Sequence, residues 1–202
     1  MFQENLSAAA KCLIESTDNE TIVLPSKLQI ELQKEHFSLK WSSNYIFCSL
    51  SGLKTRKKFQ IKNVLLVSTD NDKTGPNIDL PKIPVHYFPA NISENQDSLL
   101  AVCVKPFHYN FNRALWLVEF IEMYRIQGAN HFYFYNHTVG PEVEAVLRHY
   151  NQMGILTLLH WNLPLLSQKQ IRTEAMFSAM NDCNLRSVNR FKLLGIKPAF
   201  RY

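Results

Sequence analysis

Short apolar runs alternate with longer amphipathic segments between residues 99 and 186 of this 202-residue chain. Three runs have the length and composition of buried strands, at 99–104, 131–135 and 155–160. Three segments show helical spacing, at about 113–127, 141–153 and 169–186. Because strands that are joined by crossover helices run parallel, this order predicts an α/β fold with a mostly parallel sheet.

The predicted helices each have an apolar face. In the first, apolar side chains fall at i, i+3, i+4 and i+7: Leu117, Phe120, Ile121 and Tyr124. The second repeats the pattern: Val143, Val146, Leu147 and Tyr150. We expect these faces to form the core together with Trp116 and the aromatic strand at 131–135.

The carboxyl ends of parallel strands share one edge of the sheet, and ligands of such sheets bind outside that edge. The loops at this edge are residues 105–112, 136–140 and 160–168. We expect a ligand site there, with Trp161 as the candidate for stacking on a sugar or a base. Three histidines near strand ends lack the spacing of metal ligands and are interpreted as ordinary solvated or hydrogen-bonded imidazoles: His131, His137 and His160.

The leading part of the chain has a different pattern. Short runs rich in β-branched and aromatic residues are separated by turn formers, which predicts a small antiparallel β region. The runs are 21–24, 28–32, 37–41, 45–50, 59–61 and 64–68. Residues 71–89 contain four prolines and predict an extended linker. We expect a flexible segment at 1–18, the β-rich region with its linker at 19–90, and the α/β domain at 91–202.

Composition and charge exclude several classes of protein and of binding partner. With 46% hydrophobic residues and a net charge of +5, the chain is neither disordered nor fibrous. Basic residues are scattered except at 54–58, a run typical of a solvated hairpin tip, so nucleic acid is not an expected partner. Residues 1–16 are too polar for a signal peptide, and no apolar run has the length of a membrane span. Four N-x-S/T sequons nevertheless favour the secretory route: Asn5, Asn19, Asn91 and Asn136.

The four cysteines have neither C-x-x-C nor zinc-site spacing. Cys12 and Cys48 are candidates for a disulfide in the leading region. Cys103, in a predicted strand, and Cys183, in a predicted helix, are either paired in a lumenal protein or small apolar core residues. The sequence leaves these alternatives open.

Asp70-Asn71-Asp72 is the one Asp-x-Asp element of the chain, and it follows an apolar run as a metal clamp does. Its surroundings are rich in aspartate and asparagine, which is also typical of a turn. We favour the turn interpretation.

Lys105 stands at the end of the first predicted strand, where a cation either faces a diphosphate or uracil or is an ordinary surface lysine. On the last predicted helix, Asn181 falls on a face that we expect to be inward, so that Asn181 and Asp182 need hydrogen-bond partners. They either contact a ligand or form a structural network. Arg172 pairs with a phosphate, or with Glu174 or Asp182.

Four segments stand in order along the α/β part: CVKPF (103–107), WLVEFIEMYRIQGANHFYFYNH (116–137), GPEVEAVLRHYNQMGI (140–155) and MFSAMNDCNLR (176–186). Together they resemble glycosyltransferase family 92. The resemblance implies a GT-A, Rossmann-like sheet that binds a nucleotide sugar, with Mn²⁺ held by an Asp-x-Asp element. It implies Golgi membrane glycoproteins that transfer a hexose, galactose in known members, from a UDP-sugar donor to a glycan acceptor. The nucleotide-sugar-binding residues implied here are Lys105, His108, Asn110, Arg172, Asn181 and Asp182.

The chain also departs from that family. There, the helix with the Asn-Asp-Cys triplet is followed by a strand that ends in the acidic metal-binding cluster, whereas no acidic residue follows Asp182 here. Because a diphosphate leaving group needs a counter-charge, we expect a truncated chain that holds no metal of its own, and we assign no catalytic residue. We expect a sheet that ends one strand early, whose hydrophobic edge favours self-association. The alternatives are a non-catalytic binding or regulatory module and a cytosolic α/β protein that binds a small molecule.

Overall fold

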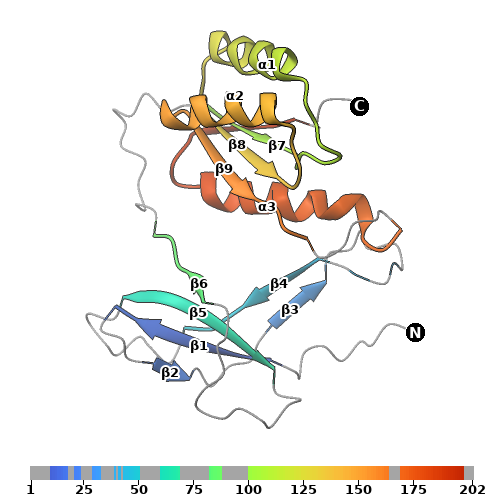
Figure 1. Cartoon of the computed structure of the whole chain (residues 1–202). Coiled ribbons are helices and arrows are strands. Elements are labelled where there is room, and N and C mark those ends of the chain that lie inside the picture. Colours follow the sequence, from blue (N-terminus) through green and yellow to red (C-terminus); the bar gives the residue numbers. More distant parts are fainter. Residues whose placement is uncertain are drawn as a thin grey trace. The chain divides into compact units, whose positions relative to one another are not determined.

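The chain forms two units in a computed structural model (Figure 1). The structure describes residues 10–17, 21–23, 29–32, 39, 41, 43–50, 60–68, 82–87, 100–163 and 169–197. The first unit comprises Met1–Ser38 and Ser42–Tyr87, and the second comprises Leu39–Trp41 and Phe88–Tyr202. Several features singled out in the sequence lie outside the described residues: the Asp70-Asn71-Asp72 element, the basic run at 54–58, most of the linker, and the sequons at Asn5, Asn19 and Asn91.

The first unit is built from antiparallel strands, as the sequence predicts. One sheet has the order β2-β1-β5-β6, with β1 (Ala10–Ser16), β2 (Thr21–Val23), β5 (Ile61–Ser68) and β6 (Ile83–Pro84). A separate antiparallel pair joins β3 (Gln29–Leu32) to β4 (Asn44–Phe47). The runs predicted at 59–61 and 64–68 correspond to the single long strand β5.

Strand β1 corrects the prediction of a flexible segment over residues 1–18. Cys12 and Ile14 are fully buried and alternate with less buried neighbours, which is the period of a strand with one face in the core. The disulfide Cys12–Cys48 joins β1 to the residue that follows β4. The run predicted at 37–41 is not a strand in its described residues: Leu39 and Trp41 belong to the second unit, where Trp41 N donates to Gln170 O at 3.0 Å.

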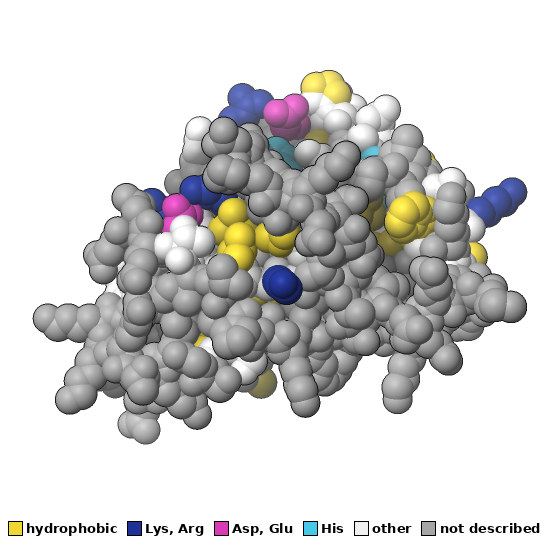
Figure 2. All heavy atoms as spheres, turned by 90° about the horizontal axis from the view of Figure 1, so that it is seen from below, with side chains coloured by type: hydrophobic (Ala, Val, Ile, Leu, Met, Phe, Trp, Pro, Cys, Tyr) yellow, Lys and Arg dark blue, Asp and Glu magenta, His cyan; other side chains and the backbone are white. Residues whose placement is uncertain are grey.

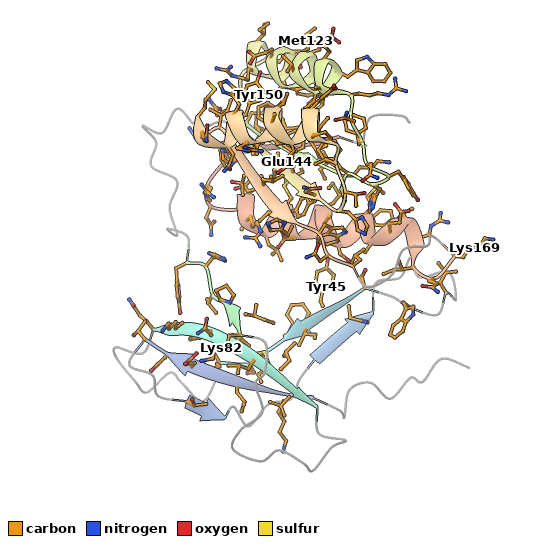
Figure 3. The ribbon with its side chains drawn as sticks, viewed as in Figure 1. Tyr45, Lys82, Met123, Glu144, Tyr150 and Lys169 are labelled. Atoms are coloured by element: carbon orange, nitrogen blue, oxygen red, sulfur yellow. A yellow bond between two sulfur atoms is a disulfide. The ribbon has the colours of Figure 1, made fainter. Side chains whose placement is uncertain are left out.

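Two side chains of the first unit are hydrogen-bonded to Glu15. Asn63 Nδ2 and Lys82 Nζ donate to its carboxylate at 2.6 and 2.9 Å. Lys82, labelled in Figure 3, directly precedes β6. On the face drawn in Figure 2, the described Lys and Arg side chains lie apart from one another among hydrophobic ones. The described part of this face therefore lacks the continuous basic stripe of nucleic-acid-binding domains.

The second unit is a three-layer α/β structure, which confirms the predicted fold class. Its parallel sheet has the order β10-β7-β8-β9, with β7 (Leu100–Val104), β8 (Ala129–Asn136), β9 (Leu156–His160) and β10 (Leu193–Lys197). The helices are α1 (Ala114–Ile126), α2 (Pro141–Gln152) and α3 (Met176–Ser187). Figure 1 shows α1 and α2 on one face of the sheet and α3 on the other.

Strand β10 is absent from the sequence-based prediction and corrects the expectation that the sheet ends one strand early. It pairs in parallel with β7 over its whole length, so that β7 is a central strand. Leu193 and Ile196 of β10 are 62% and 61% exposed. The run was missed because Gly195 interrupts it and a proline follows it.

The sheet separates two cores because its side chains alternate strictly. Val102, Val104, Phe132 and Phe134 face α1 and α2. The residues between them face α3, where they pack on Ala179, Met180 and Cys183: Ala101, Cys103, Tyr133 and Tyr135. The predicted apolar faces of α1 and α2 contribute to the first core, as expected.

Two helix predictions need correction. Trp116 is not a core residue: it is 46% exposed on the outer surface of α1, where the Arg113 guanidinium lies 4.1 Å from its ring centroid. Met123 also points away from the sheet in Figure 3. The last helix begins at Met176 rather than near 169, because the backbone at residues 173–175 is left-handed and cannot continue a right-handed helix.

None of the helices in the described ranges is both long and apolar enough to cross a membrane.

Candidate functional site

The carboxyl edge of the parallel sheet has a topological switch point between β7 and β10. At this edge, the connection that leaves β7 runs to α1 on one face of the sheet, whereas the connection that leaves β9 runs to α3 on the opposite face (Figure 1). The two connections diverge here and leave room for a ligand outside the strand ends. The loop at 105–112, which follows β7, lies here.

Two phenylalanines anchor this loop to the sheet. Phe107 N donates to Tyr135 O at 2.9 Å, and its carbonyl accepts from His137 N at 3.1 Å. Its buried ring stacks between Phe111 and Phe134, with centroids 5.1 and 5.4 Å away. Because these rings belong to the core, the polar residues between them are held in place at the sheet edge.

A cavity of about 180 Å³ lies between this loop and the start of α3. Its walls are Lys105, Pro106, His108, Tyr109, Thr173, Glu174 and Met176. Lys105 brings a positive charge, and Met176 is the first residue of α3, where a helix carries partial positive charge. Lys105 and the helix N-terminus favour an anionic group in the cavity, whereas the acidic side chain of Glu174 in its wall opposes one.

A larger and more open hollow, of about 450 Å³, is lined by residues around the end of α1 and the start of β8, at the opposite edge of the sheet. Its charged residues Glu122 and Arg125 are paired at 2.9 Å, and Tyr150 also donates to Glu122 at 2.6 Å. Since these groups already satisfy one another and no strand ends there at its carboxyl side, we take the smaller cavity as the candidate site.

Glu174 is the buried acid of the cavity, with 7% of its surface exposed. The Tyr109 hydroxyl donates to Oε1, and His108 Nε2 lies 3.2 Å from Oε2. Trp161 Nε1 donates to the Glu174 carbonyl at 3.4 Å. The loop after β7 and the segment after β9 therefore both meet the chain just before α3 at this one residue.

His108 is buried beside Glu174 and is held in its neutral form. Burial is the main cause that lowers its pKa below the usual histidine value; Glu174 opposes this shift, while His137 and Lys105 add to it. The His137 ring lies 4.9 Å from that of His108 between centroids. At neutral pH, the His108–Glu174 contact is therefore a hydrogen bond to a carboxylate rather than a full ion pair.

Left-handed backbone is concentrated at the cavity. Among the described residues other than glycine, six have positive φ, and five of them lie in the two segments that supply its walls: Tyr109, Asn110, Thr173, Glu174 and Ala175, with φ between 46° and 59°. Each such residue costs about 1 kcal/mol or more. Strain of this kind persists at functional sites because the surrounding structure enforces it.

Buried polar atoms without a hydrogen-bond partner also gather here. Within the described ranges they are Asn136 Oδ1, His137 Nδ1, Thr173 Oγ1 and Ser178 Oγ. Thr173 lines the cavity, and His137 contacts His108 in its wall. Buried polar groups are nearly always hydrogen-bonded, and of these four residues Thr173 is the one that lines the cavity.

The structure places the six predicted binding residues unequally. Lys105 and His108 line the cavity. Asn110 is exposed in the same loop, and its N–H donates to Thr138 Oγ1 at 3.2 Å. Arg172 is exposed and directly precedes Thr173 in the other wall.

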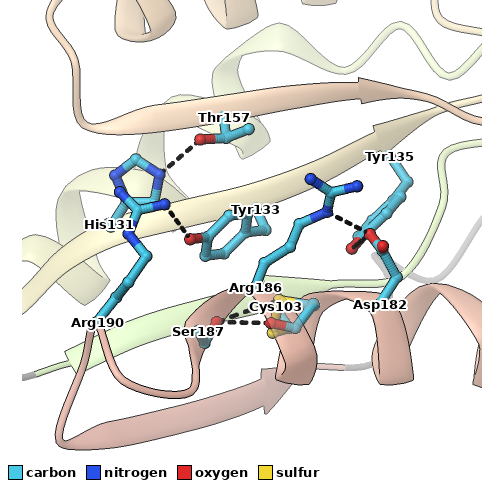
Figure 4. The surroundings of a disulfide bond; sticks show 10 residues. Cys103, His131, Tyr133, Tyr135, Thr157, Asp182, Arg186, Ser187 and Arg190 are labelled. Carbon is cyan, nitrogen blue, oxygen red and sulfur yellow. Dashed lines mark hydrogen bonds and ion pairs between the residues drawn. A yellow bond between two sulfur atoms is a disulfide. The ribbon is translucent and has the colours of Figure 1, made fainter. Parts of the chain in front are cut away.

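Asp182 lies in a network on α3 instead of in the cavity wall. It accepts from the Tyr135 hydroxyl and from Arg186 Nε, both at 2.7 Å (Figure 4). Burial, reinforced by Asp182, raises the pKa of Tyr135. The inward face of α3 consists of Ala179, Met180, Cys183 and Ser187, and Asn181 is half-buried beside it. Asp182 thus belongs to a structural network, one of the two alternatives that the sequence offered, and its contact with a ligand stays a prediction.

The disulfide Cys103–Cys183 fastens α3 to the central strand directly behind the site (Figure 4). Both cysteines are fully buried, and Cys103 lies two residues before Lys105. The cysteines are thus paired rather than apolar fillers. Disulfides form in oxidising compartments, so both bridges of this chain agree with folding in the secretory pathway.

Sequence analysis missed Glu174, Tyr109 and Thr173 as members of the site. Glu174 and Tyr109 are 65 residues apart, and no periodic pattern relates them. The available signal was the predicted position of both segments at the ligand edge, which does not select individual side chains.

The described residues do not form a site for Mn²⁺. No group of three His, Cys, Asp or Glu side chains in the described ranges is arranged to hold a metal. Near the cavity, Glu174 is engaged by His108 and Tyr109, and Asp182 by Tyr135 and Arg186. No chemical step is therefore derived through a metal.

The comparison with known families agrees with this geometry. Residues 98–196 match the sequence model of glycosyltransferase family 92. The chain is a glycosyltransferase family 92 domain protein. The family 92 match begins just before β7 and ends within β10, so it covers the parallel sheet, its three helices and the cavity. Membership of family 92 supports glycosyltransferase activity in general, a nucleotide-sugar donor with a glycan acceptor, and a place in the secretory pathway. No curated protein matches the chain.

Proposed function

We propose that the cavity at the end of β7 binds the diphosphate end of a nucleotide-sugar donor and that the chain acts as a hexosyltransferase. The observation that carries this proposal is the meeting of Lys105 with the N-terminus of α3 at the switch point of the sheet. A diphosphate needs compensation of its negative charge, and a lysine together with a helix N-terminus provides part of it.

The proposed donor is a UDP-sugar, with UDP-galactose as the first to test, and the proposed acceptor is a glycan on a glycoprotein or glycolipid in the Golgi. These finer assignments follow from the family resemblance. Thr173, which lines the cavity, suits such a donor, because its hydroxyl can donate to a phosphate oxygen.

In this proposal, the residues of the chain bind and orient the donor. Lys105 neutralises the diphosphate, and Phe107 keeps Lys105 at the mouth of the sheet through its buried ring. Fixing the donor before reaction lowers the entropic part of the barrier.

A second candidate function is nucleotide-sugar binding without transfer. The observation that favours it is that the carboxylates nearest the cavity, Glu174 and Asp182, are already engaged by neighbouring side chains. Mn²⁺, which the family resemblance implies, is then not required for binding by the described residues.

Calorimetric titration with UDP and UDP-galactose, with and without MnCl₂, tests the proposal. We expect the wild-type chain to bind UDP and Lys105→Met to bind it about tenfold more weakly, a difference of about 1.4 kcal/mol. Lys192→Met is the matched control, because Lys192 is exposed and directly precedes β10, at the opposite edge of the sheet. Equal affinity of all three proteins would contradict the site. A galactose-transfer assay on the same samples separates enzyme from binding module.

A further inference from the structure

Glu174 joins two walls of the cavity that are distant in sequence. Its carboxyl group receives the Tyr109 hydroxyl on one oxygen and lies 3.2 Å from His108 Nε2 with the other. Both partners belong to the loop that contains Lys105. Glu174 itself directly precedes Ala175, the N-cap residue of α3, and its carbonyl accepts from Trp161.

Burying the carboxyl group of Glu174 on left-handed backbone costs more free energy than an apolar side chain that only fills this space would cost. A buried carboxyl group loses its hydration and must be compensated by hydrogen bonds. In addition, Glu174 and both of its neighbours adopt left-handed backbone, with φ of 46°, 52° and 58°. An apolar side chain on ordinary backbone would close the same space with less strain, so the geometry points to a task for the carboxyl group.

The contacts identify this task. Tyr109 is 63% exposed, so that its ring adds little to the core, and its hydroxyl reaches back to Glu174. His108 is buried and neutral, and it too is directed at Glu174. Tyr109 and Asn110 are the left-handed residues of the loop, so the bend of the loop coincides with its attachment.

We propose that Glu174 is a positioning residue that ties the 105–112 loop to the start of α3 and so holds Lys105 in its donor-binding place. The role rests on the proposed function of the cavity. Glu174 touches no reacting atom in this account: it acts through Tyr109 and His108. The donor then finds both walls of the cavity already in place, and no binding free energy is spent on ordering the loop.

Two substitutions weaken the tether with little change in volume. Tyr109→Phe deletes only the hydroxyl of an exposed ring, and Glu174→Gln removes the charge while it keeps the shape. Their matched controls are Tyr124→Phe, on the half-buried Tyr124 of α1, and Glu144→Gln, on an exposed residue of α2 whose partner is Arg148 at 3.6 Å.

Two measurements are made on each protein: amide hydrogen exchange of residues 105–112 in the absence of ligand, and the affinity for UDP. We expect Tyr109→Phe and Glu174→Gln to speed exchange in the loop at least about fivefold and to weaken UDP binding by a similar factor, with exchange in α1 and α2 unchanged. Both controls should match the wild type. A role confined to overall stability would instead change exchange throughout the second unit.

The outcomes separate this inference from the proposed function. If the wild-type chain binds UDP and the two tether variants bind it equally well, the positioning role of Glu174 is overturned and the donor site stands. Unchanged loop exchange in both variants overturns it as well. If the wild-type chain does not bind UDP at all, the proposed function fails, and the donor-positioning role fails with it.

Discussion

His131 shows, at the scale of one residue, how the fold changes the chemistry of a side chain. It lies on β8 and is buried, with Nε2 2.8 Å from Thr157 Oγ1 and its ring stacked on Phe191 (Figure 4). Burial, together with the nearby Arg190 cation, lowers the pKa of His131 to about 4. The hydrogen bond to Thr157 confirms that His131 is a hydrogen-bonded imidazole rather than a solvated one.

This shift predicts that acid destabilises the chain. The pKa of His131 is about 4 in the folded state and about 6.5 when unfolded, so that the unfolded state binds more protons between these values. The contribution of neutral, buried His131 to the free energy of unfolding is fully present above pH 6.5 and is lost as the pH falls towards 4. We expect the free energy of unfolding to fall by about 2–3 kcal/mol between pH 7 and pH 4.5 because of His131 alone.

Denaturant unfolding as a function of pH measures this effect. In His131→Asn, the fall in stability over this range should shrink by about that amount, whereas His149→Asn, at an exposed position of α2, should follow the wild-type curve. The smaller contribution of His108, whose pKa is also lowered, has the same sign and remains in both variants. Identical pH dependence in His131→Asn and the wild type would show that His131 is not the group responsible.

The start of α2 shows how one element depends on another. Asn112, in the loop before α1, accepts from Glu142 N and Val143 N at 3.0 and 3.3 Å and so caps α2 from outside its own sequence. Gly140 makes this possible, because a Cβ atom there would lie 2.3 Å from Asn112 Cγ. Gly140 is thus required by close approach, since its φ of −79° is open to any residue.

Gly140→Ala should therefore lower the free energy of unfolding by about 1–3 kcal/mol, through displacement of Asn112 and loss of the cap. Asn112→Ala alone should cost about 1 kcal/mol. In the Asn112→Ala background, Gly140→Ala should cost less but still destabilise, because Cγ and Oδ1 of residue 112 are gone whereas its Cβ remains 2.5 Å from the new methyl group. Denaturant unfolding of the wild type, the two single variants and the double variant gives the coupling free energy between residues 112 and 140.

The control glycine is Gly195 of β10, where a Cβ atom would meet its nearest neighbour, Ala101 O, at 3.7 Å in ordinary contact. Gly195→Ala should leave stability nearly unchanged. Strictly additive costs for Gly140→Ala and Asn112→Ala would contradict the proposed contact.

The elements were predictable where burial follows a period. α1 and α2 each bury one stripe, and β7 and β8 are continuous apolar runs, so residue spacing alone located them. α3 was placed too early because residues 169–175 have helical composition, while contacts of Glu174 with a distant loop hold the backbone in another conformation. Such a tertiary preference leaves no trace in local spacing.

At the scale of the whole molecule, the sequence predicted an antiparallel β region followed by a parallel α/β unit, and the structure has both. It did not predict which strand is central, because β10 returns to the far side of β7. The edge of the sheet that carries the ligand site followed from topology. The members of the site did not, since Lys105 and Glu174 approach each other only after the α/β unit has closed.

The two disulfides each stabilise one of the two units of the molecule. Cys12–Cys48 lies in the first unit and Cys103–Cys183 in the second, and the paired cysteines are separated by 36 and 80 positions in the sequence. Closing loops of this length stabilises a fold mainly by restricting the unfolded chain. The sequence offered Cys12–Cys48 as a candidate and left Cys103–Cys183 undecided, because connectivity depends on the approach of β7 to α3.

The central claim is that a nucleotide-sugar donor binds at the carboxyl edge of the sheet, between the loop after β7 and the start of α3. Amide hydrogen exchange of the wild-type chain with and without saturating UDP tests it most directly. The account predicts slower exchange with UDP in residues 105–112 and 173–180, and no change around the hollow at 126–130 on the opposite edge. Protection confined to 126–130, or no protection anywhere in the second unit, would contradict it.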